Sequence, residues 1–204
     1  MKRYRINEVF HSLQGEGIRA GTANVFVRFT GCNLQCRQEA DPRSPGGFDC
    51  DTEFASGRSV TGAELLAWIN TVSNGQCPWL VLTGGEPGLQ LDADLISCLH
   101  DAGHQLAIET NGSIALPEGL DWVTVSPKVA EHAIRQTTAN EVKYVRGYGQ
   151  AIPQTVVDAP HKLISPAFRG LASDAETIKW CSQLVMENPE WRLSVQMHKV
   201  WTLP

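Results

Sequence analysis

Residues 61–110 read TGAELLAWINTVSNGQCPWLVLTGGEPGLQLDADLISCLHDAGHQLAIET. A capping box begins at Thr61 and opens a run of apolar residues at helical spacing, and Asp92 can cap a second helix. The β-rich runs 79–83 and 105–110 follow these two helices. Because helices and strands alternate, this part of the chain predicts parallel βαβ units.

Further β-rich runs lie outside this segment, and a third capped helix is predicted to begin at Ser173. The additional strand candidates are 23–30, 122–125, 141–145, 161–164 and 191–197. Only three clear helices serve about six or seven strands, and a complete eight-stranded βα barrel needs about 250 residues. The predicted fold is therefore α/β: a shortened, partly open parallel βα barrel.

Length and charge limit the range of functions. The 204 residues favour one domain spanning 1–204. Seventeen basic against 22 acidic residues give a net charge of −5 without a basic block, which disfavours a nucleic-acid partner and favours a small ligand. The N-terminus has no apolar targeting segment, and no run approaches the roughly 18 apolar residues of a membrane span. We expect a cytoplasmic protein without a membrane partner.

Several predicted strands end in polar side chains, namely Thr83, Glu109, Ser126, Lys143, Ser165 and Gln196. In parallel α/β architectures, ligands bind at the carboxyl ends of the strands. We therefore expect these side chains to share one mouth of the barrel.

The chain has six cysteines, far fewer than a disulfide scaffold carries. Three lie among apolar residues or beside a strand and are expected to be structural: Cys77, Cys98 and Cys181. The others, Cys32, Cys36 and Cys50, follow the strand at 23–30 in a Gly/Pro-rich loop. Their thiolates could bind Zn²⁺ with a histidine as fourth ligand, or hold three irons of a 4Fe-4S cluster. Spacing alone favours neither site.

A second motif distinguishes these two sites. Thr83-Gly84-Gly85-Glu86-Pro87 ends the strand at 79–83, and Cys32-x-x-x-Cys36 follows the strand at 23–30. This combination resembles the radical S-adenosylmethionine (SAM) superfamily, in which the cysteine loop binds a cluster and the Gly-Gly-Glu-Pro strand end meets the methionine moiety of SAM.

Further motifs narrow the resemblance to the 7-carboxy-7-deazaguanine synthase family. They are Leu13-Gln14-Gly15-Glu16-Gly17, Phe29-Thr30-Gly31-Cys32-Asn33-Leu34, Cys50-Asp51-Thr52, Ile108-Glu109-Thr110-Asn111-Gly112, Val125-Ser126-Pro127-Lys128, and the C-terminal run from Trp191 to Lys199. The resemblance covers nearly the whole chain and weakens only between about residues 131 and 172.

The resemblance implies a lyase that converts 6-carboxy-5,6,7,8-tetrahydropterin to 7-carboxy-7-deazaguanine by ring contraction with loss of ammonia. This reaction is a step toward queuosine and related 7-deazapurines. The implied cofactors are a 4Fe-4S cluster, SAM and Mg²⁺. The implied assembly is a homodimer, reduced by an electron donor such as flavodoxin or ferredoxin.

The resemblance also assigns roles to individual residues. The cluster ligands are Cys32, Cys36 and Cys50, in a cluster-binding loop over residues 31–52, and Thr52 offers a hydroxyl to Mg²⁺. The residues implied to face the pterin are Leu13, Gln14, Gly15, Glu16, Arg28, Thr83, His198 and Pro204. Those implied to line the SAM site are Gly84, Gly85, Glu86, Glu109, Asn111, Ser126, Pro127, Lys128, Ser165, Pro166, Ala167 and Phe168.

The chemistry of the substrate agrees with three of these assignments. Arg28 lies within an otherwise apolar strand and can form a bidentate pair with the substrate carboxylate. Glu16 and the terminal carboxylate of Pro204 can accept hydrogen bonds from the N–H groups of the aminopyrimidinone edge.

The sequence departs from the family pattern in two places. One branch of the family has a cluster cysteine three residues before the last one, where this chain has Gly47, so the second ligand must be Cys36. Residues 165–168 read Ser-Pro-Ala-Phe where some members have Gln-Pro-Met-Asp, and only Pro166 agrees. Any contact there is expected to run through backbone groups.

Two other functions are compatible with parts of the sequence. An activating enzyme that generates glycyl radicals would share the SAM motifs but would leave Arg28 and the terminal carboxylate without an obvious task. A zinc-stapled binding module would use the three loop cysteines and a histidine such as His11.

Overall fold

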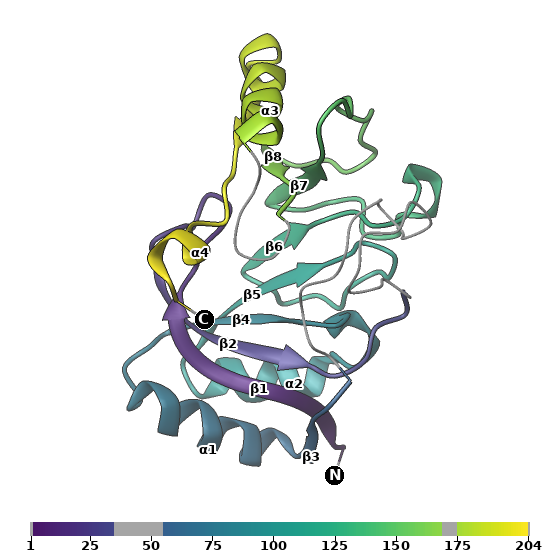
Figure 1. Ribbon diagram of the computed structural model, residues 1–204. Helices are drawn as coiled ribbons and strands as arrows, with labels where there is room; N and C mark the ends of the chain where they lie inside the picture. The colour runs from purple at the N-terminus through teal and green to yellow at the C-terminus, as the bar shows by residue number, and fades with distance from the viewer. Residues whose placement is uncertain (1, 35–54, 169–174, 204) are drawn as a thin grey trace.

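The computed structural model describes residues 2–34, 55–168 and 175–203. In this part of the chain, nine strands form a single sheet in the order β3-β1-β2-β4-β5-β6-β7-β8-β9 (Figure 1). The sheet is open, with β3 at one edge and β9 at the other. The prediction of an α/β fold with a partly open, mostly parallel sheet is confirmed.

The elements have the following bounds. The strands are β1 (Tyr4–Leu13), β2 (Ala23–Phe29), β3 (Arg58–Val60), β4 (Trp79–Gly84), β5 (Gln105–Thr110), β6 (Trp122–Val125), β7 (Glu141–Arg146), β8 (His161–Pro166) and β9 (Trp191–Leu193). The α-helices are α1 (Gly62–Ser73), α2 (Ala93–Asp101), α3 (Ala175–Glu187) and α4 (Met197–Trp201), and short 3₁₀ helices are η2 (Pro87–Leu89) and η3 (Glu131–Ala133).

The sheet is parallel from β2 to β9, whereas β1 runs antiparallel to both β2 and β3. Helices α1 and α2 precede and follow β4, but the connections from β5 to β8 contain no α-helix in the described structure. The three predicted helices are therefore present, with the short α4 in addition. None of the helices in the described ranges is long and apolar enough to cross a membrane.

The predicted capping residues begin two of the helices. Thr61 accepts a hydrogen bond from the Glu64 backbone N–H at 3.2 Å, and the Glu64 carboxylate accepts one from the Thr61 backbone N–H at 2.6 Å. This reciprocal pair satisfies two of the donors that a helix start leaves free. Asp92 caps α2 by accepting from the Leu95 N–H at 2.9 Å.

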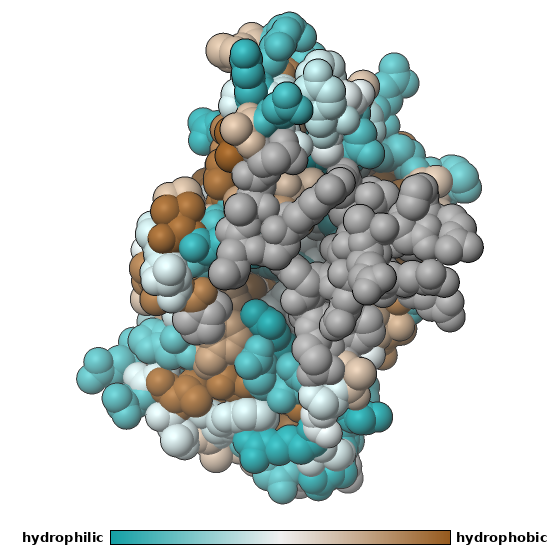
Figure 2. Space-filling view, viewed as in Figure 1, coloured by the Kyte–Doolittle hydropathy of each residue, from teal (hydrophilic) through white to brown (hydrophobic). Residues whose placement is uncertain are grey.

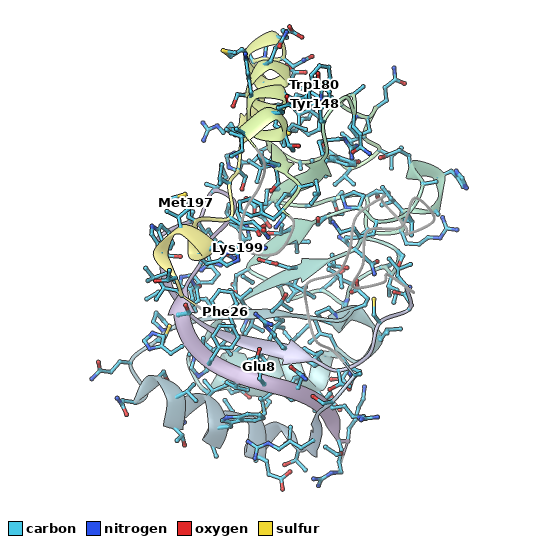
Figure 3. The ribbon with its side chains drawn as sticks, in the orientation of Figure 1. Glu8, Phe26, Tyr148, Trp180, Met197 and Lys199 are labelled. Atoms are coloured by element: carbon cyan, nitrogen blue, oxygen red, sulfur yellow. The ribbon has the colours of Figure 1, made fainter. Side chains whose placement is uncertain are left out.

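The hydrophobic core lies on one face of the sheet, in two clusters. The first cluster packs β1, β2, β4 and β5 against α1 and α2, and Phe29, Leu65 and Leu99 are among its fully buried side chains. The second lies between β6–β9 and α3, where Cys181 is buried. The Trp180 ring of α3 lies 5.6 Å from that of Tyr148 (Figure 3). We call the opposite face of the sheet the inner face.

The structure differs from the sequence prediction at both ends of the chain. Strand β1 was not predicted, because a register irregularity between Ile6 and Glu8 interrupts the two-residue alternation of its apolar side chains. Strand β3 was not predicted either, because it has only three residues. The predicted strand at 191–197 was wrong beyond Leu193. There the Met197 N–H donates to the carbonyl oxygens of Gly15 and Val195, both at 2.9 Å, and α4 begins.

Candidate active site

Predicted site residues on neighbouring strands share the inner face. Val27 and Phe29 are buried in the first core cluster, so Arg28 between them points to the opposite side of the sheet. Arg28 pairs in register with Thr83 of β4. The same alternation puts Glu109 of β5 on the inner face. The structure therefore brings together residues that the sequence assigned to the pterin side and to the SAM side.

Arg28 is held by an acidic neighbour that the sequence did not single out. Its Nη1 lies 3.1 Å from Oε1 of Glu8, and its guanidinium carbon lies 5.0 Å from the ring centre of Phe10. The Phe10 ring in turn stacks on Phe26 at 5.1 Å (Figure 3 labels Glu8 and Phe26). With 28% of its side chain exposed, Arg28 can still meet a carboxylate from solution.

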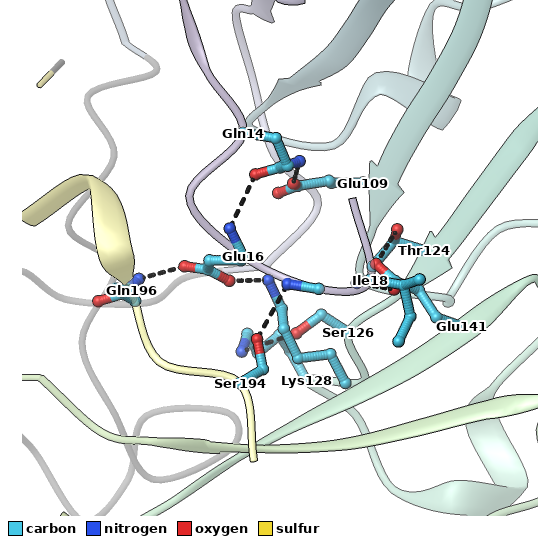
Figure 4. A network of polar contacts seen from close by, with 12 residues as sticks. Gln14, Glu16, Ile18, Glu109, Thr124, Ser126, Lys128, Glu141, Ser194 and Gln196 are labelled. Atoms are coloured by element: carbon cyan, nitrogen blue, oxygen red, sulfur yellow. Dashed lines mark hydrogen bonds and ion pairs between the residues drawn. The ribbon is translucent and has the colours of Figure 1, made fainter. Parts of the chain in front are cut away.

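The loop between β1 and β2 crosses the inner face and is fixed to it by several strands (Figure 4). Gln14 donates from Nε2 to Oε1 of Glu109 at 3.0 Å and accepts from the backbone N–H of Glu16 at 3.1 Å. The Ile18 N–H donates to Oε2 of Glu141 at 2.9 Å. The Gly17 N–H donates to Oγ of Ser194 at 2.9 Å. The loop thus has one defined course across the sheet.

The C-terminal segment lies directly against the same loop. A Cβ atom on Gly15 would lie 2.7 Å from Cβ of His198, closer than real Cβ contacts. Only glycine therefore permits the observed approach of α4. Together with the hydrogen bond from Met197 N to Gly15 O, this contact brings His198 to the loop.

A buried ion pair lies at the centre of the site. Oε2 of Glu16 contacts Nζ of Lys143 on β7, and their side chains are 12% and 7% exposed. Oε1 of Glu16 accepts a hydrogen bond from Nε2 of Gln196 at 2.6 Å (Figure 4). Thus the loop, β7 and the residue before α4 meet at one carboxylate.

The ion pair determines the protonation of both partners. Burial alone would raise the pKa of Glu16, but the charge and hydrogen bond of Lys143, and the Gln196 hydrogen bond, lower it to about 2. Burial would lower the pKa of Lys143, but Glu16 and Glu109 hold that pKa above its ordinary value. Both groups are therefore charged at neutral pH.

The Gly-Gly-Glu-Pro strand end holds the start of the cysteine loop. The Gly85 N–H donates to Phe29 O at 3.0 Å, and the Glu86 N–H donates to Gly31 O at 2.9 Å. A Cβ atom on Gly85 would lie 2.5 Å from the carbonyl carbon of Gly31 and closer still to its oxygen. Two glycines thus let the backbones touch immediately before Cys32.

The carboxylate of Glu86 joins the ends of β4 and β5. It is fully buried and accepts hydrogen bonds from Oγ1 of Thr110 and from the N–H groups of Asn111 and Gly88, at 2.8, 2.8 and 2.9 Å. Burial raises its pKa, and these three hydrogen bonds oppose that change. The Glu86 side chain is therefore engaged within the protein, and the backbone of the motif is what remains for a cofactor.

Asn111 extends this connection to the cysteine loop. Its Nδ2 donates to Oδ1 of Asn33 at 3.1 Å, and Asn33 Nδ2 donates to Oγ of Ser113 at 2.8 Å. The predicted SAM-site residue is thus bonded to a residue adjacent to Cys32.

The remaining predicted SAM-site residues follow β6 and β8. Lys128 donates from Nζ to Oγ of Ser126 at 3.3 Å, with Pro127 between them. Ser165 is buried at the end of β8. The Ala167 N–H donates a hydrogen bond to the backbone carbonyl oxygen of Arg146. Nζ of Lys199 lies 4.8 Å from the ring centre of Phe168 (Figure 3 labels Lys199). This contact connects the segment 165–168 to α4.

Four predicted site residues, Cys36, Cys50, Thr52 and Pro204, lie outside the described residues. Cys32 is partly exposed and its Sγ accepts a hydrogen bond from the Leu34 N–H at 3.4 Å. A donor set of three thiolates and no oxygen suits an iron–sulfur cluster. Within the described ranges, no group of three or more His, Cys, Asp or Glu side chains could hold a metal ion. Cys77 and Cys181 are buried, as predicted for structural cysteines, whereas Cys98 is only partly buried.

The family resemblance assigned no role to Lys143 or Gln196, although the sequence predicted both among the polar strand ends that share one mouth of the barrel. A sequence signal for Lys143 exists: it is a single basic residue between Val142 and Tyr144 in an apolar run. Charged residues are rarely buried unless they are paired, so such a lysine implies a buried partner. No comparable signal identifies Glu8, because one of its sequence neighbours is polar and the other is apolar.

Three comparisons with known proteins agree with this geometry. A family profile described as "4Fe-4S single cluster domain" matches residues 13–145. The 7-carboxy-7-deazaguanine synthase of Nitratidesulfovibrio vulgaris is 39% identical, over 98% of this chain and 99% of its own. The protein of the same name from Bacteroides thetaiotaomicron is 41% identical, over 96% of both chains. The crystal structure of QueE from Escherichia coli has the same fold, with a TM-score of 0.69, 24% identity, and coverage of 96% of this chain and 95% of that one.

Proposed function

The chain belongs to the 7-carboxy-7-deazaguanine synthase family, and we propose that it catalyses the reaction of that family. It is a radical SAM lyase that converts 6-carboxy-5,6,7,8-tetrahydropterin to 7-carboxy-7-deazaguanine with loss of ammonia, in queuosine biosynthesis. The observation that carries this conclusion is the backbone contact between Gly31 and Gly85, which joins the cysteine loop to the Gly-Gly-Glu-Pro strand end. The alternatives of a zinc-stapled module and a glycyl-radical activating enzyme are set aside, because relatives over almost the full chain carry the synthase name.

We propose that Cys32, Cys36 and Cys50 hold the 4Fe-4S cluster within the loop 31–52, and that residues 1–204 form one radical SAM core domain. When bound, the cluster and SAM supply the electron and the hydrogen-atom abstraction that start the ring contraction. The contribution of this chain is to bind and orient the reactants, since a displacement of about 1 Å can cost a hundredfold in rate.

The proposed pterin site uses both signs of charge on the inner face. Arg28 is a cation for the substrate carboxylate, and Glu16 is an acceptor for the N–H groups of the aminopyrimidinone edge. Gln14 accepts a hydrogen bond from the Glu16 backbone, and His198 of α4 packs against the loop. The other proposed pterin contacts are Leu13, Gly15, Thr83 and Pro204.

The proposed SAM site begins at the Gly84–Glu86 strand end and continues across neighbouring strand ends. Its further members are Glu109, Asn111, Ser126, Pro127, Lys128 and the segment 165–168. Gln14 bonds directly to Glu109, so the two proposed sites share a wall. We also propose that Thr52 supplies one oxygen to Mg²⁺, an ion that prefers oxygen ligands and keeps several waters.

We further propose a homodimer, a cytoplasmic location and a flavodoxin or ferredoxin as electron donor. Val200 and Leu203 support the dimer, because they are 63% and 37% exposed in and after α4. Figure 2 shows hydrophobic side chains gathered in this region, on the left of the view. A reducing compartment suits a chain whose cysteines serve as thiolates.

The test is anaerobic reconstitution with iron and sulfide, followed by turnover with the pterin, SAM, Mg²⁺ and a reductant. We expect one 4Fe-4S cluster per chain and a product with the mass of 7-carboxy-7-deazaguanine. A reconstituted protein that cleaves SAM but leaves the pterin unchanged would contradict the proposed reaction. A protein that binds Zn²⁺ and no cluster would contradict the whole proposal.

A further inference from the structure

We infer that Lys143 is a positioning residue for the pterin site: it fixes Glu16 as an ionised acceptor for the N–H groups of the substrate's aminopyrimidinone edge. This inference rests on the proposed function, which assigns Glu16 to that edge. It adds a residue that the family resemblance did not assign, and it explains how a carboxylate is kept charged in a nearly buried position.

The location of Lys143 suits this task. It lies in the middle of β7, in register with Leu163 of β8, and its neighbours Val142 and Tyr144 are buried in the second core cluster. Its side chain therefore points to the inner face, where it contacts Glu16. A rigid central strand holds an ammonium more precisely than a loop does.

Stability alone does not explain this pair. Bringing two charges out of water costs several kcal/mol per ion, and an apolar pair of similar volume is often as stable or more so. The pair also joins segments far apart in sequence, since Glu16 and Lys143 are separated by 127 positions. A specific arrangement of the carboxylate is therefore a better explanation for its presence.

The carboxylate keeps acceptor capacity for a ligand. An ionised carboxylate offers about four lone-pair sites on its two oxygens. In the described structure Lys143 and Gln196 each contact one oxygen of Glu16, which leaves one lone-pair site on each oxygen. Two adjacent N–H donors, such as those of an aminopyrimidinone edge, match two such acceptors.

The surrounding charges make Lys143 indispensable for the charge of Glu16. His198 of α4 faces Glu16, while Glu109 of β5 and Glu141 of β7 lie near Lys143. Without the lysine, the carboxylates would repel one another, and burial would raise the pKa of Glu16. A protonated Glu16 would lose acceptor capacity and present an O–H where the substrate presents N–H groups.

The experiment measures pterin affinity of the anaerobic holoenzyme with SAM and Mg²⁺ but without reductant, between about pH 5 and 8. Lys143→Met should weaken binding at least about tenfold near the acidic end, since a hydrogen bond to a charged group contributes that much. Its affinity should recover toward the alkaline end as Glu16 ionises. Lys143→Arg should keep the wild-type profile, because the cation is retained.

Two further variants separate charge from structure. The double variant Glu16→Gln/Lys143→Met should bind weakly without the additional pH dependence, because the titrating group is gone. Lys179→Gln changes an exposed lysine of α3 and should leave the profile unchanged. The profile of each variant is compared with that of the wild type measured in the same buffers.

The outcomes distinguish this inference from the proposed function. Wild-type affinity in Lys143→Met, or an equal loss at every pH, would overturn the positioning role. Should Lys143→Met fail to fold, Lys143→Gln carries the same prediction with a smaller change in polarity. A wild-type holoenzyme that does not bind the pterin would instead contradict the proposed function.

Discussion

Replacing Gly85 with alanine should separate the Gly-Gly-Glu-Pro strand end from the start of the cysteine loop. The new Cβ would lie 2.5 Å from the carbonyl carbon of Gly31 and closer still to its oxygen, whereas ordinary contacts begin at 3.4 Å, so the backbones must part by more than about 1 Å. A shift of that size weakens two hydrogen bonds, from Gly85 N to Phe29 O and from Glu86 N to Gly31 O. At about 0.5–1.5 kcal/mol per bond, with about 1–3 kcal/mol for overpacking, the free energy of unfolding should fall by roughly 2–6 kcal/mol.

Urea unfolding of the apo protein measures the stability, and iron content after anaerobic reconstitution measures the cluster site. Gly85→Ala should lose stability and hold less than half of the wild-type iron, because Cys32 follows Gly31 directly. The matched control is Gly62→Ala in the first turn of α1, where the nearest atom to a Cβ is the Cys98 side chain at 3.2 Å. Unchanged stability and iron content in Gly85→Ala would refute the argument that this close approach builds the cluster loop.

Three further predictions concern the cluster, the substrate carboxylate and acid stability. Cys36→Ala should abolish reductive cleavage of SAM, whereas Cys98→Ala should retain it; activity in the first variant would remove Cys36 from the ligand set. Glu8→Gln should tighten pterin binding about twofold to fivefold, because Glu8 competes with the substrate carboxylate for Arg28 and an exposed ion pair contributes that much. Weaker binding would contradict this competition. The pKa of Glu16 falls from 4.5 to about 2 on folding, so its stabilisation is present above pH 4.5 and is lost as pH falls toward 2. Urea unfolding across that range should show a smaller loss of stability in Glu16→Gln than in the wild type.

The sequence predicted the parallel half of the fold well, because local signals specify it. The capping box at Thr61 and the cap at Asp92 both have the expected hydrogen bonds. Strand β1 escaped prediction because its irregular register interrupts the alternation on which strand prediction depends. The segment after Leu193 was wrongly predicted as strand, because a contact with Gly15, far away in sequence, turns the chain there.

The candidate site was predictable to a similar degree, for the same reason. Motifs contained in one short segment, such as Gly84-Gly85-Glu86, are readable because the backbone contacts they make require those residue types. The pairing of Glu16 with Lys143 is not readable, since neither residue has a sequence neighbour that reports its partner. Contacts between distant segments depend on the completed fold. The sequence therefore predicted candidate site residues but not which of them contact one another.

The two proposed halves of the site, one for the cluster and one for the pterin, therefore depend on different parts of the molecule. The cluster half is built where β2 and β4 end, through Gly31, Gly85 and the buried Glu86. The pterin half is built where one loop crosses the sheet and meets β7 and the C-terminal segment, and Gln196 contacts Glu16 across 180 positions. A change in the C-terminal segment is therefore expected to disturb the proposed pterin half more than the proposed cluster half.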